Sequence, residues 1–425
     1  MATLRWLGRA AAVAQVTTLT VGGTVEAGDK FIVTCNGKSV TVSATTTSTA
    51  TTATEIYTAI NALTDSLYPE FAEFTATNAT ASVVTLTGDT PGVPFTVTVN
   101  TTESNGGAAD TQTFVAATTT AATGPNHWDN VNNWDTGAAP TTGDTVYIEN
   151  SDIDILYGLD QNAVTLAALY VRQSFTGEIG LPEVHSGGAA DYPEYRDTYL
   201  KISATILTVG DGPGQGSGRI KINTGSVATT LTVNGLGTPA EQDIPAMLWK
   251  GTDATNIVRV YKGTFAAAWL GTDAANIATL NVGYQTAQAS DVAVYCGAVT
   301  FATAISQEGG TLSLNTGVTT LTTKGGNMLV QGSGAITTLN NWGSRVVYRG
   351  TGTVTTLNLG IGSSMDYAQD MRGRTVTNTN VYGPVTIFDP FTTVTFTNPP
   401  KLYGQGIEDV TIIRGKNITI ATAVI

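Results

Sequence analysis

The sequence has few charged residues, and positive charge is especially scarce. Only 12% of its 425 residues are charged, and 20 basic against 33 acidic side chains leave a net charge of -13. Nucleic-acid binding needs clustered lysine and arginine, so we expect no nucleic-acid partner. No run of 18 apolar residues occurs, and we therefore expect no membrane-spanning segment.

Cysteine and histidine are almost absent. Cys35 and Cys296 lie far apart in the sequence and are interpreted as free thiols. His127 and His185 have no second histidine or cysteine at metal-ligand spacing, so we interpret them as surface or cap residues. We expect no metal, no cofactor and no Ser/His/Asp catalytic arrangement. Arg9 interrupts the short alanine-rich start, so we predict no signal peptide and synthesis in a host cytoplasm.

Threonine and glycine are abundant, and their distribution predicts a mainly β protein. Threonine favours strands, and the 47 glycines, together with asparagine, supply turns. Hydrophobic residues make up 41% of the chain and recur in runs of strand length, which argues against disorder. A helical bundle, a coiled coil and a doubly wound α/β enzyme are excluded as the main architecture.

Residues 1–100 have the pattern of a compact ββαβββ module. Asn36-Gly37 is a strong hairpin signal between the expected strands 31–35 and 38–43. Thr52 and Glu55 have capping-box spacing and predict a helix that Pro69 ends. Further strands are expected at 14–21, 71–77, 83–87 and 95–99.

This order of elements, carried by residues 16–44, 53–63 and 83–99, resembles small β-rich assembly modules of tailed-phage structural proteins, including modules inserted in contractile sheath-like proteins. The resemblance implies a role in assembly rather than in chemistry. Residues 101–126, rich in threonine and alanine, are interpreted as a linker with one strand at most.

From residue 127 to residue 425 the sequence is repetitive. The tetrapeptides that begin at Val318, Ile336 and Val354 follow each other at a spacing of 18 residues, and they end at Leu321, Leu339 and Leu357. The same spacing separates Leu312, Val330 and Tyr348, and it also separates Val376 from Val394. Trp249 and Trp269 are 20 residues apart. Such periods predict a parallel β-helix, or β-solenoid, of about 18–20 residues and three strands per coil.

The start of the repetitive region, residues 127–150, contains Trp128, Trp134 and a Gly143-Asp144 turn. It resembles the opening of pectate-lyase-like β-helices and of bacterial surface passenger proteins. The two tryptophans are expected to cap the open end of the first coil. Residues 173–198 are interpreted as an insert or outer loop.

Two pairs of carboxylates are the candidates for chemistry. Asp253 and Asp273 stand in repeated Gly-Thr-Asp turns, and equivalent positions in adjacent coils would bring them to the separation of a retaining glycosidase. The same arrangement could equally bind a cation. Asp152 and Asp154 flank Ile153 and are expected on one strand face. A structural role is favoured for both pairs, with Asn256 and Asn276 satisfying turn backbone.

Three other segments are interpreted as structural. Residues 210–218 match a glycine-rich phosphate loop only superficially, because a strand follows them, and we predict a turn. The insert contains a cluster of tyrosines and one arginine, and we favour packing of these side chains over the solenoid. A contact with another subunit or with a capsid is the alternative role. A surface ion-pair cluster or a subunit contact is expected at the acidic and basic residues near 370. The residues concerned are Tyr192, Tyr195, Arg196 and Tyr199 in the insert, and Asp366, Asp370, Arg372 and Arg374 near 370.

These observations favour a non-enzymatic virion structural protein of a tailed phage or prophage, with no catalytic, cofactor or metal site. An exposed capsid decoration (cement) protein or a fibre-like protein is expected, as a homotrimer in contact with major capsid or tail proteins, with host glycans as a further partner. The first alternative is a tailspike-type polysaccharide depolymerase, and the second is a bacterial surface adhesin or passenger protein.

Overall fold

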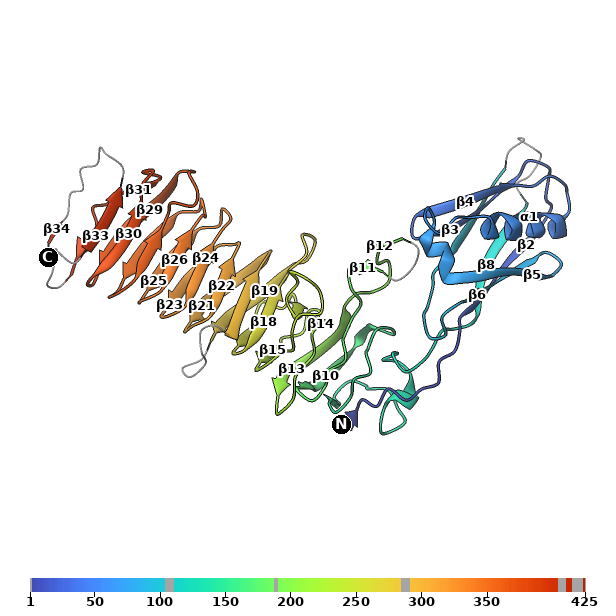
Figure 1. Ribbon diagram of the computed structural model, residues 1–425, viewed down its shortest axis with the longest axis horizontal. Helices are drawn as coiled ribbons and strands as arrows, with labels where there is room; N and C mark the ends of the chain where they lie inside the picture. Colours follow the sequence, from blue (N-terminus) through green and yellow to red (C-terminus); the bar gives the residue numbers. More distant parts are fainter. Residues whose placement is uncertain are drawn as a thin grey trace.

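The computed structural model describes residues 2–103, 111–186, 190–283, 291–403, 410–414 and 423–424. It shows an elongated β-solenoid and, beside the solenoid end that holds the N-terminus, a smaller antiparallel module (Figure 1). The predicted fold class, a mainly β chain with an N-terminal β module and a parallel β-helix, is confirmed.

Two parallel ladders form most of the solenoid, and from β13 to β31 the chain alternates between them. The first ladder consists of β9 (Thr145–Ile148), β10 (Asp160–Arg172), β13 (Leu200–Asp211), β15 (Thr230–Val233), β17 (Ile257–Val260), β19 (Ala275–Val282), β21 (Val299–Gln307), β23 (Val318–Thr323), β25 (Ile336–Asn341), β27 (Val354–Leu359), β29 (Arg374–Val381), β31 (Val394–Phe396), β32 (Lys401–Leu402) and β34 (Ala423–Val424). The second, which the start of β13 also joins, consists of β14 (Ile220–Asn223), β16 (Met247–Lys250), β18 (Gly263–Ala267), β20 (Val292–Cys296), β22 (Thr311–Leu314), β24 (Asn327–Val330), β26 (Arg345–Tyr348), β28 (Ser364–Asp366), β30 (Val385–Asp389) and β33 (Val410–Arg414).

The predicted ladder of aliphatic side chains is present. Val318 pairs with Ile336, and Ile336 pairs with Val354 in the next coil. Leu339 pairs in the same way with Leu321 and Leu357. All six side chains are buried in one core that extends from Leu4 to Leu402. Successive coils therefore share a single dry interior, which no coil could form alone.

The coils differ from the prediction in strand number and in length. Most coils among the described residues contribute two named strands rather than three, and the coil that begins with β30 contributes three, because β31 and β32 both pair with β29. Leu312 pairs with Met328, 16 residues on, so its alignment with Val330 was wrong. Val376 pairs with Phe396 instead of Val394. The spacing varies because turns of different length join the strands while the strand register is kept.

The first coil is closed by aromatic side chains, as predicted for Trp128 and Trp134. Their rings lie 4.8 Å apart, edge to face, and both are buried. Trp6 packs against Trp134 at 5.2 Å and completes the cluster. Strand β1 (Thr3–Arg5) adds to the ladder beside β9, so the first residues belong to the solenoid and not to the module.

In its described residues the module has two antiparallel sheets and one α-helix. One sheet has the order β5-β6-β2-β8 and the other has the order β4-β3-β7, and helix α1 contacts strands of both. Their buried side chains form a core separate from that of the solenoid. The elements are β2 (Val16–Gly22), β3 (Lys30–Cys35), β4 (Lys38–Ser43), α1 (Thr49–Asn61), the 3-10 helix η1 (Pro69–Glu73), β5 (Phe74–Thr80), β6 (Val83–Gly88), β7 (Thr98–Thr102) and β8 (Thr113–Thr120).

Local signals located the helix but misplaced its start and its end. Ser48, not Thr52, is the N-cap, and its side chain accepts a hydrogen bond from the Thr51 backbone N–H. Thr52 is buried inside the helix, and Glu55 accepts a hydrogen bond from the Thr45 hydroxyl. Pro69 begins η1 rather than ending α1.

The expected boundaries at residues 100 and 126 differ from the structure. Strand β8, inside the expected linker 101–126, pairs with β2 and belongs to the module. Val13 and Thr123 form an antiparallel bridge with two backbone hydrogen bonds of 2.7 and 3.3 Å. The module is therefore an insertion between these two residues, and the chain returns to the solenoid beside the point where it left.

The stacked core predicts a sharp difference between two neighbouring positions of β25. Leu339→Asp should lower the free energy of unfolding by at least ~3 kcal/mol, because it places an unpaired charge in the dry core. Thr337→Asp, at an exposed position of the same strand, should change it by less than ~0.5 kcal/mol. Urea unfolding followed by circular dichroism measures both, and equal losses would contradict the inward assignment of Leu339.

Candidate functional sites

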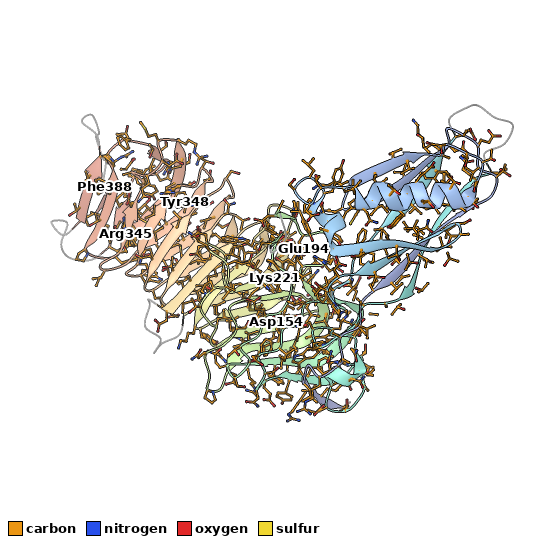
Figure 2. The ribbon with its side chains drawn as sticks, turned by 45° about the vertical axis from the view of Figure 1, so that its right-hand side comes forward. Asp154, Glu194, Lys221, Arg345, Tyr348 and Phe388 are labelled. Carbon is orange, nitrogen blue, oxygen red and sulfur yellow. The ribbon has the colours of Figure 1, made fainter. Side chains whose placement is uncertain are left out.

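The insert of residues 173–198 meets the module in a buried polar cluster. We call Glu73, Tyr192, Glu194, Tyr195 and Arg196 the junction cluster. Glu73 ends η1, and both tyrosine hydroxyls donate hydrogen bonds to its carboxylate. Arg196 lies 3.2 Å from Glu73 and donates from Nε to Glu194 at 2.8 Å. Figure 2 shows Glu194 where the first coils meet the module.

Burial makes the charges of the junction cluster depend on one another. The side chains of Glu73, Glu194 and Arg196 are only 10%, 0% and 8% exposed. Burial acts to raise the pKa of Glu194, but hydrogen bonds from Arg196 outweigh burial and lower it. Burial, followed by the charge of Glu73, raises the pKa of Tyr195. Arg196 thus compensates two carboxylates that would otherwise be buried without a counter-charge.

The expected packing of the insert tyrosines over the solenoid holds for only one of them. Tyr199 is buried and donates a hydrogen bond to Asp273 at 3.0 Å. Tyr192 and Tyr195 contact the module instead, and Tyr195 packs against the module core. On the solenoid side, the buried Lys221 pairs with Glu183 of the insert at 2.9 Å. The insert therefore connects the two parts of the chain.

Asp253 and Asp273 are not equivalent positions in the structure. Trp249 pairs with Ala267 rather than with Trp269, so the repeated turns are out of register by two residues. Asp253 is half-exposed and accepts two hydrogen bonds from Thr255. Asp273 is buried and pairs with Lys250 at 2.6 Å. The paired geometry of a retaining glycosidase is therefore not built here.

The two predicted turn asparagines do satisfy backbone groups. Asn256 accepts from the Thr229 N–H at 2.8 Å and donates to the Asn276 carbonyl at 3.0 Å. Asn276 donates to the Thr252 carbonyl at 2.6 Å. Their role in this part of the solenoid is structural, as predicted.

In the second acidic pair, Asp152 and Asp154, the residue Asp154 contacts Glu178, which the sequence patterns did not indicate. Asp152 is exposed, whereas Asp154 accepts a hydrogen bond from the Glu178 N–H at 2.8 Å. Burial raises the pKa of Glu178, and the charge of Asp154 adds to this effect. Glu178 also pairs with Arg219 and lines a hollow of about 560 Å³. Asp154 and Glu178 belong to no common sequence motif. Only the parallel stacking of coils brings them together, so the sequence alone could not indicate their contact.

The remaining predicted positions have structural contacts. Asp370 pairs with Arg372 at 2.5 Å and with Arg374 at 3.6 Å, as expected, although Arg374 is buried and not at the surface. Asp366 pairs with Arg345 at 3.2 Å and with neither of these arginines, so its expected place in the cluster was wrong. The hydrogen bonds from Arg372, followed by its charge, lower the pKa of Asp370.

The glycine-rich segment and the two histidines are also structural. Residues 212–218 form the predicted turn before β14, with positive φ at Gly212, Gly214 and Gly216, whereas Gly210 and Asp211 still belong to β13. His127 is buried in the cap, where its Nε2 lies 2.7 Å from the Gly92 carbonyl of the module. His185 stacks on Tyr192 at 4.7 Å. Both cysteines are buried free thiols, and burial, followed by the charges of Glu73 and Glu70, raises the pKa of Cys35 to about 12.

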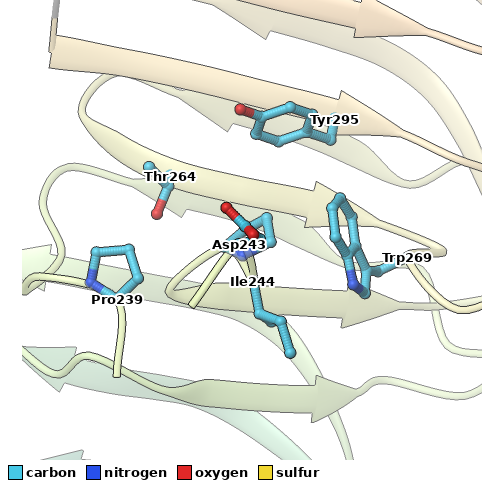
Figure 3. Close-up of a pocket in the computed structure, with 7 residues that line it drawn as sticks. Pro239, Asp243, Ile244, Thr264, Trp269 and Tyr295 are labelled. Carbon is cyan, nitrogen blue, oxygen red and sulfur yellow. The ribbon is translucent and has the colours of Figure 1, made fainter. Parts of the chain in front are cut away.

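A shallow apolar hollow of about 220 Å³ lies on the outer side of the second ladder (Figure 3). Trp269 and Tyr295 form one wall, with their rings 5.7 Å apart and edge to face. The hollow contains one carboxylate, Asp243, and no second titratable group apart from Tyr295. It offers a surface for contact rather than a constellation for acid–base chemistry.

No family model matches the chain, and no curated protein matches it either. Among the described residues, no helix has the length and apolarity that a membrane crossing requires.

The junction cluster predicts an asymmetry between two arginines. Arg196→Met should destabilise the contact between module and insert by about 3 kcal/mol, because it leaves Glu73 and Glu194 buried without a counter-charge. Arg372→Met, which removes an exposed ion pair of similar local geometry, should change it little. Thermal unfolding of the full chain compares the two, and equal losses would show that Arg196 is not a buried counter-ion.

The lowered pKa of Glu194 gives a direction for the effect of acid. Its folded-state pKa lies below the unfolded value of 4.5, so its contribution to stability is present above that value and is lost as the pH falls below it. We expect the junction to weaken below about pH 4.5, and small-angle scattering would report a change in the arrangement of module and solenoid. Glu194→Gln should lose this pH dependence, and an unchanged profile would assign the acid transition to other carboxylates.

Proposed function

We propose that the protein is a non-enzymatic structural component of a tailed-phage particle, displayed as a capsid decoration or fibre-like protein. The module attaches the chain to the particle, and the solenoid is an elongated arm. The observation that carries this proposal is the combination of one continuous solenoid core with a separately cored module inserted at its capped end. The likeness of the module to phage assembly domains supports the choice of particle.

The surroundings of most acidic candidates favour this role over catalysis. Asp253 accepts hydrogen bonds from Thr255 in its own turn, Asp154 accepts one from the Glu178 N–H, and Asp273 pairs with Lys250. A general acid and base need different environments that separate their pKa values. These contacts hold a turn in place or join neighbouring coils instead. We further propose a homotrimer, because several weak module contacts acting together raise the effective concentration at the particle surface.

The test uses the adjacency of Val13 and Thr123. Replacing residues 14–122 by a short Gly-Ser linker should leave a folded solenoid, because both chain ends remain in place at the cap. We expect the full chain, but not the shortened one, to copurify with particles from cells that carry the native phage genome. Incorporation of the shortened chain at normal copy number would place the attachment surface on the solenoid. Absence of the full chain from particles would contradict the proposal itself.

A polysaccharide depolymerase is the second candidate, and Glu178 is the observation that favours it. Its raised pKa suits a general acid, and its hollow is open to a ligand. Its ion pair with Arg219 opposes this role, because the arginine stabilises the charged carboxylate.

We expect no release of reducing ends when the protein is incubated with host capsule or lipopolysaccharide. If release occurs, Glu178→Gln should abolish it, and Asp253→Asn serves as the control for a carboxylate outside the hollow. Release that depends on Glu178 would replace the structural proposal by the enzymatic one.

A further inference from the structure

Three carboxylates converge in the module, in a place that no sequence motif indicated. Glu26, Asp29 and Glu103 each bring an oxygen atom to within 4.8 Å of the oxygens of the other two. We call them the carboxylate triad. Glu26 and Asp29 belong to the turn that precedes β3, and Glu103 follows β7.

The strand register explains why these residues meet. In the antiparallel pair β3–β7, Lys30 lies opposite Thr102, so Asp29 and Glu103 are the next facing positions. Like charges directly opposite each other on paired strands repel. The turn at Gly28, which has a φ of 104°, folds Glu26 back towards Asp29, and the Glu26 N–H donates to Asp29 Oδ2 at 2.7 Å. Backbone geometry therefore holds three acidic groups together.

Asp29 provides an independent sign of a missing ligand. Its side chain is 0% exposed, yet its Oδ1 has no hydrogen-bond partner among the described residues. A buried carboxylate oxygen ordinarily has a donor or a cation beside it.

We propose that the carboxylate triad binds a calcium ion that ties the turn before β3 to the end of β7. The ligand set is made of carboxylate oxygens, which suits a hard cation rather than zinc or copper. Calcium accepts irregular arrangements of six to eight oxygens, whereas magnesium demands a near-ideal octahedron, so a turn that meets a strand end favours calcium. Bound calcium neutralises the facing carboxylates and gives Asp29 Oδ1 a partner.

The experiment uses the full chain, stripped with EDTA and then titrated with calcium chloride in an isothermal calorimeter and in thermal melts. We expect one binding event, and a rise of about 5 °C in the melting transition of the module at saturating calcium. Magnesium chloride at the same concentration should give a much smaller shift. Absence of calcium binding, or equal binding of magnesium, would overturn the proposal.

Two substitutions in the carboxylate triad test whether calcium binds there. Asp29→Asn keeps the acceptor for the Glu26 N–H and removes a negative charge, so it should melt no lower than the wild type in EDTA but fail to respond to calcium. Glu103→Gln should lose at least tenfold in calcium affinity and provides a second test if Asp29→Asn does not fold. Asp89→Asn, an acidic position of the module that hydrogen-bonds to Thr75, is the matched control and should bind calcium normally. Normal binding by both triad variants would place the ion elsewhere and reject the site.

Discussion

Coil stacking is the constraint on which the rest of the structure depends. A single coil exposes half of its side chains to an interior that only the next coil can close, so stability accumulates through neighbour contacts. The two ends of such a stack have no neighbour on one side. At the first coil the indole rings of Trp6, Trp128 and Trp134 cover the open face, and β1 adds a strand to the open ladder. The module is inserted after these N-terminal residues, so they remain at the cap.

The sequence predicted the stacked core well where turns have a constant length. Val318, Ile336 and Val354 recur every 18 residues, and their pairing follows directly. Elsewhere, turn length changes between coils, so equal spacing no longer means equal position, as Leu312 and Val330 show. The interior is also less uniformly apolar than the repeats suggested. Gln307, Thr323 and Asn341 are fully buried in successive coils, and Thr323 donates to Gln307 at 3.1 Å.

The candidate sites were harder to predict, for a physical reason. Motif reasoning detects residues that are close in sequence or repeat regularly, and it therefore selected Asp253 and Asp273. The polar groups that interact most strongly come from distant segments, such as Glu73 with Arg196, which only the docking of the insert on the module brings together. Glu178 next to Asp154, and Asp29 next to Glu103, likewise depend on strand register rather than on spacing.

The paired connection at Val13 and Thr123 has a mechanical consequence. Any pull on the module reaches the first coil through two chain segments at once, because both lead into the same cap. One of them is β1, which lies alongside β9, so a pull along that strand loads its hydrogen bonds together instead of peeling them one after another. The aromatic cap that closes the core thereby also becomes the anchor point through which tension is shared.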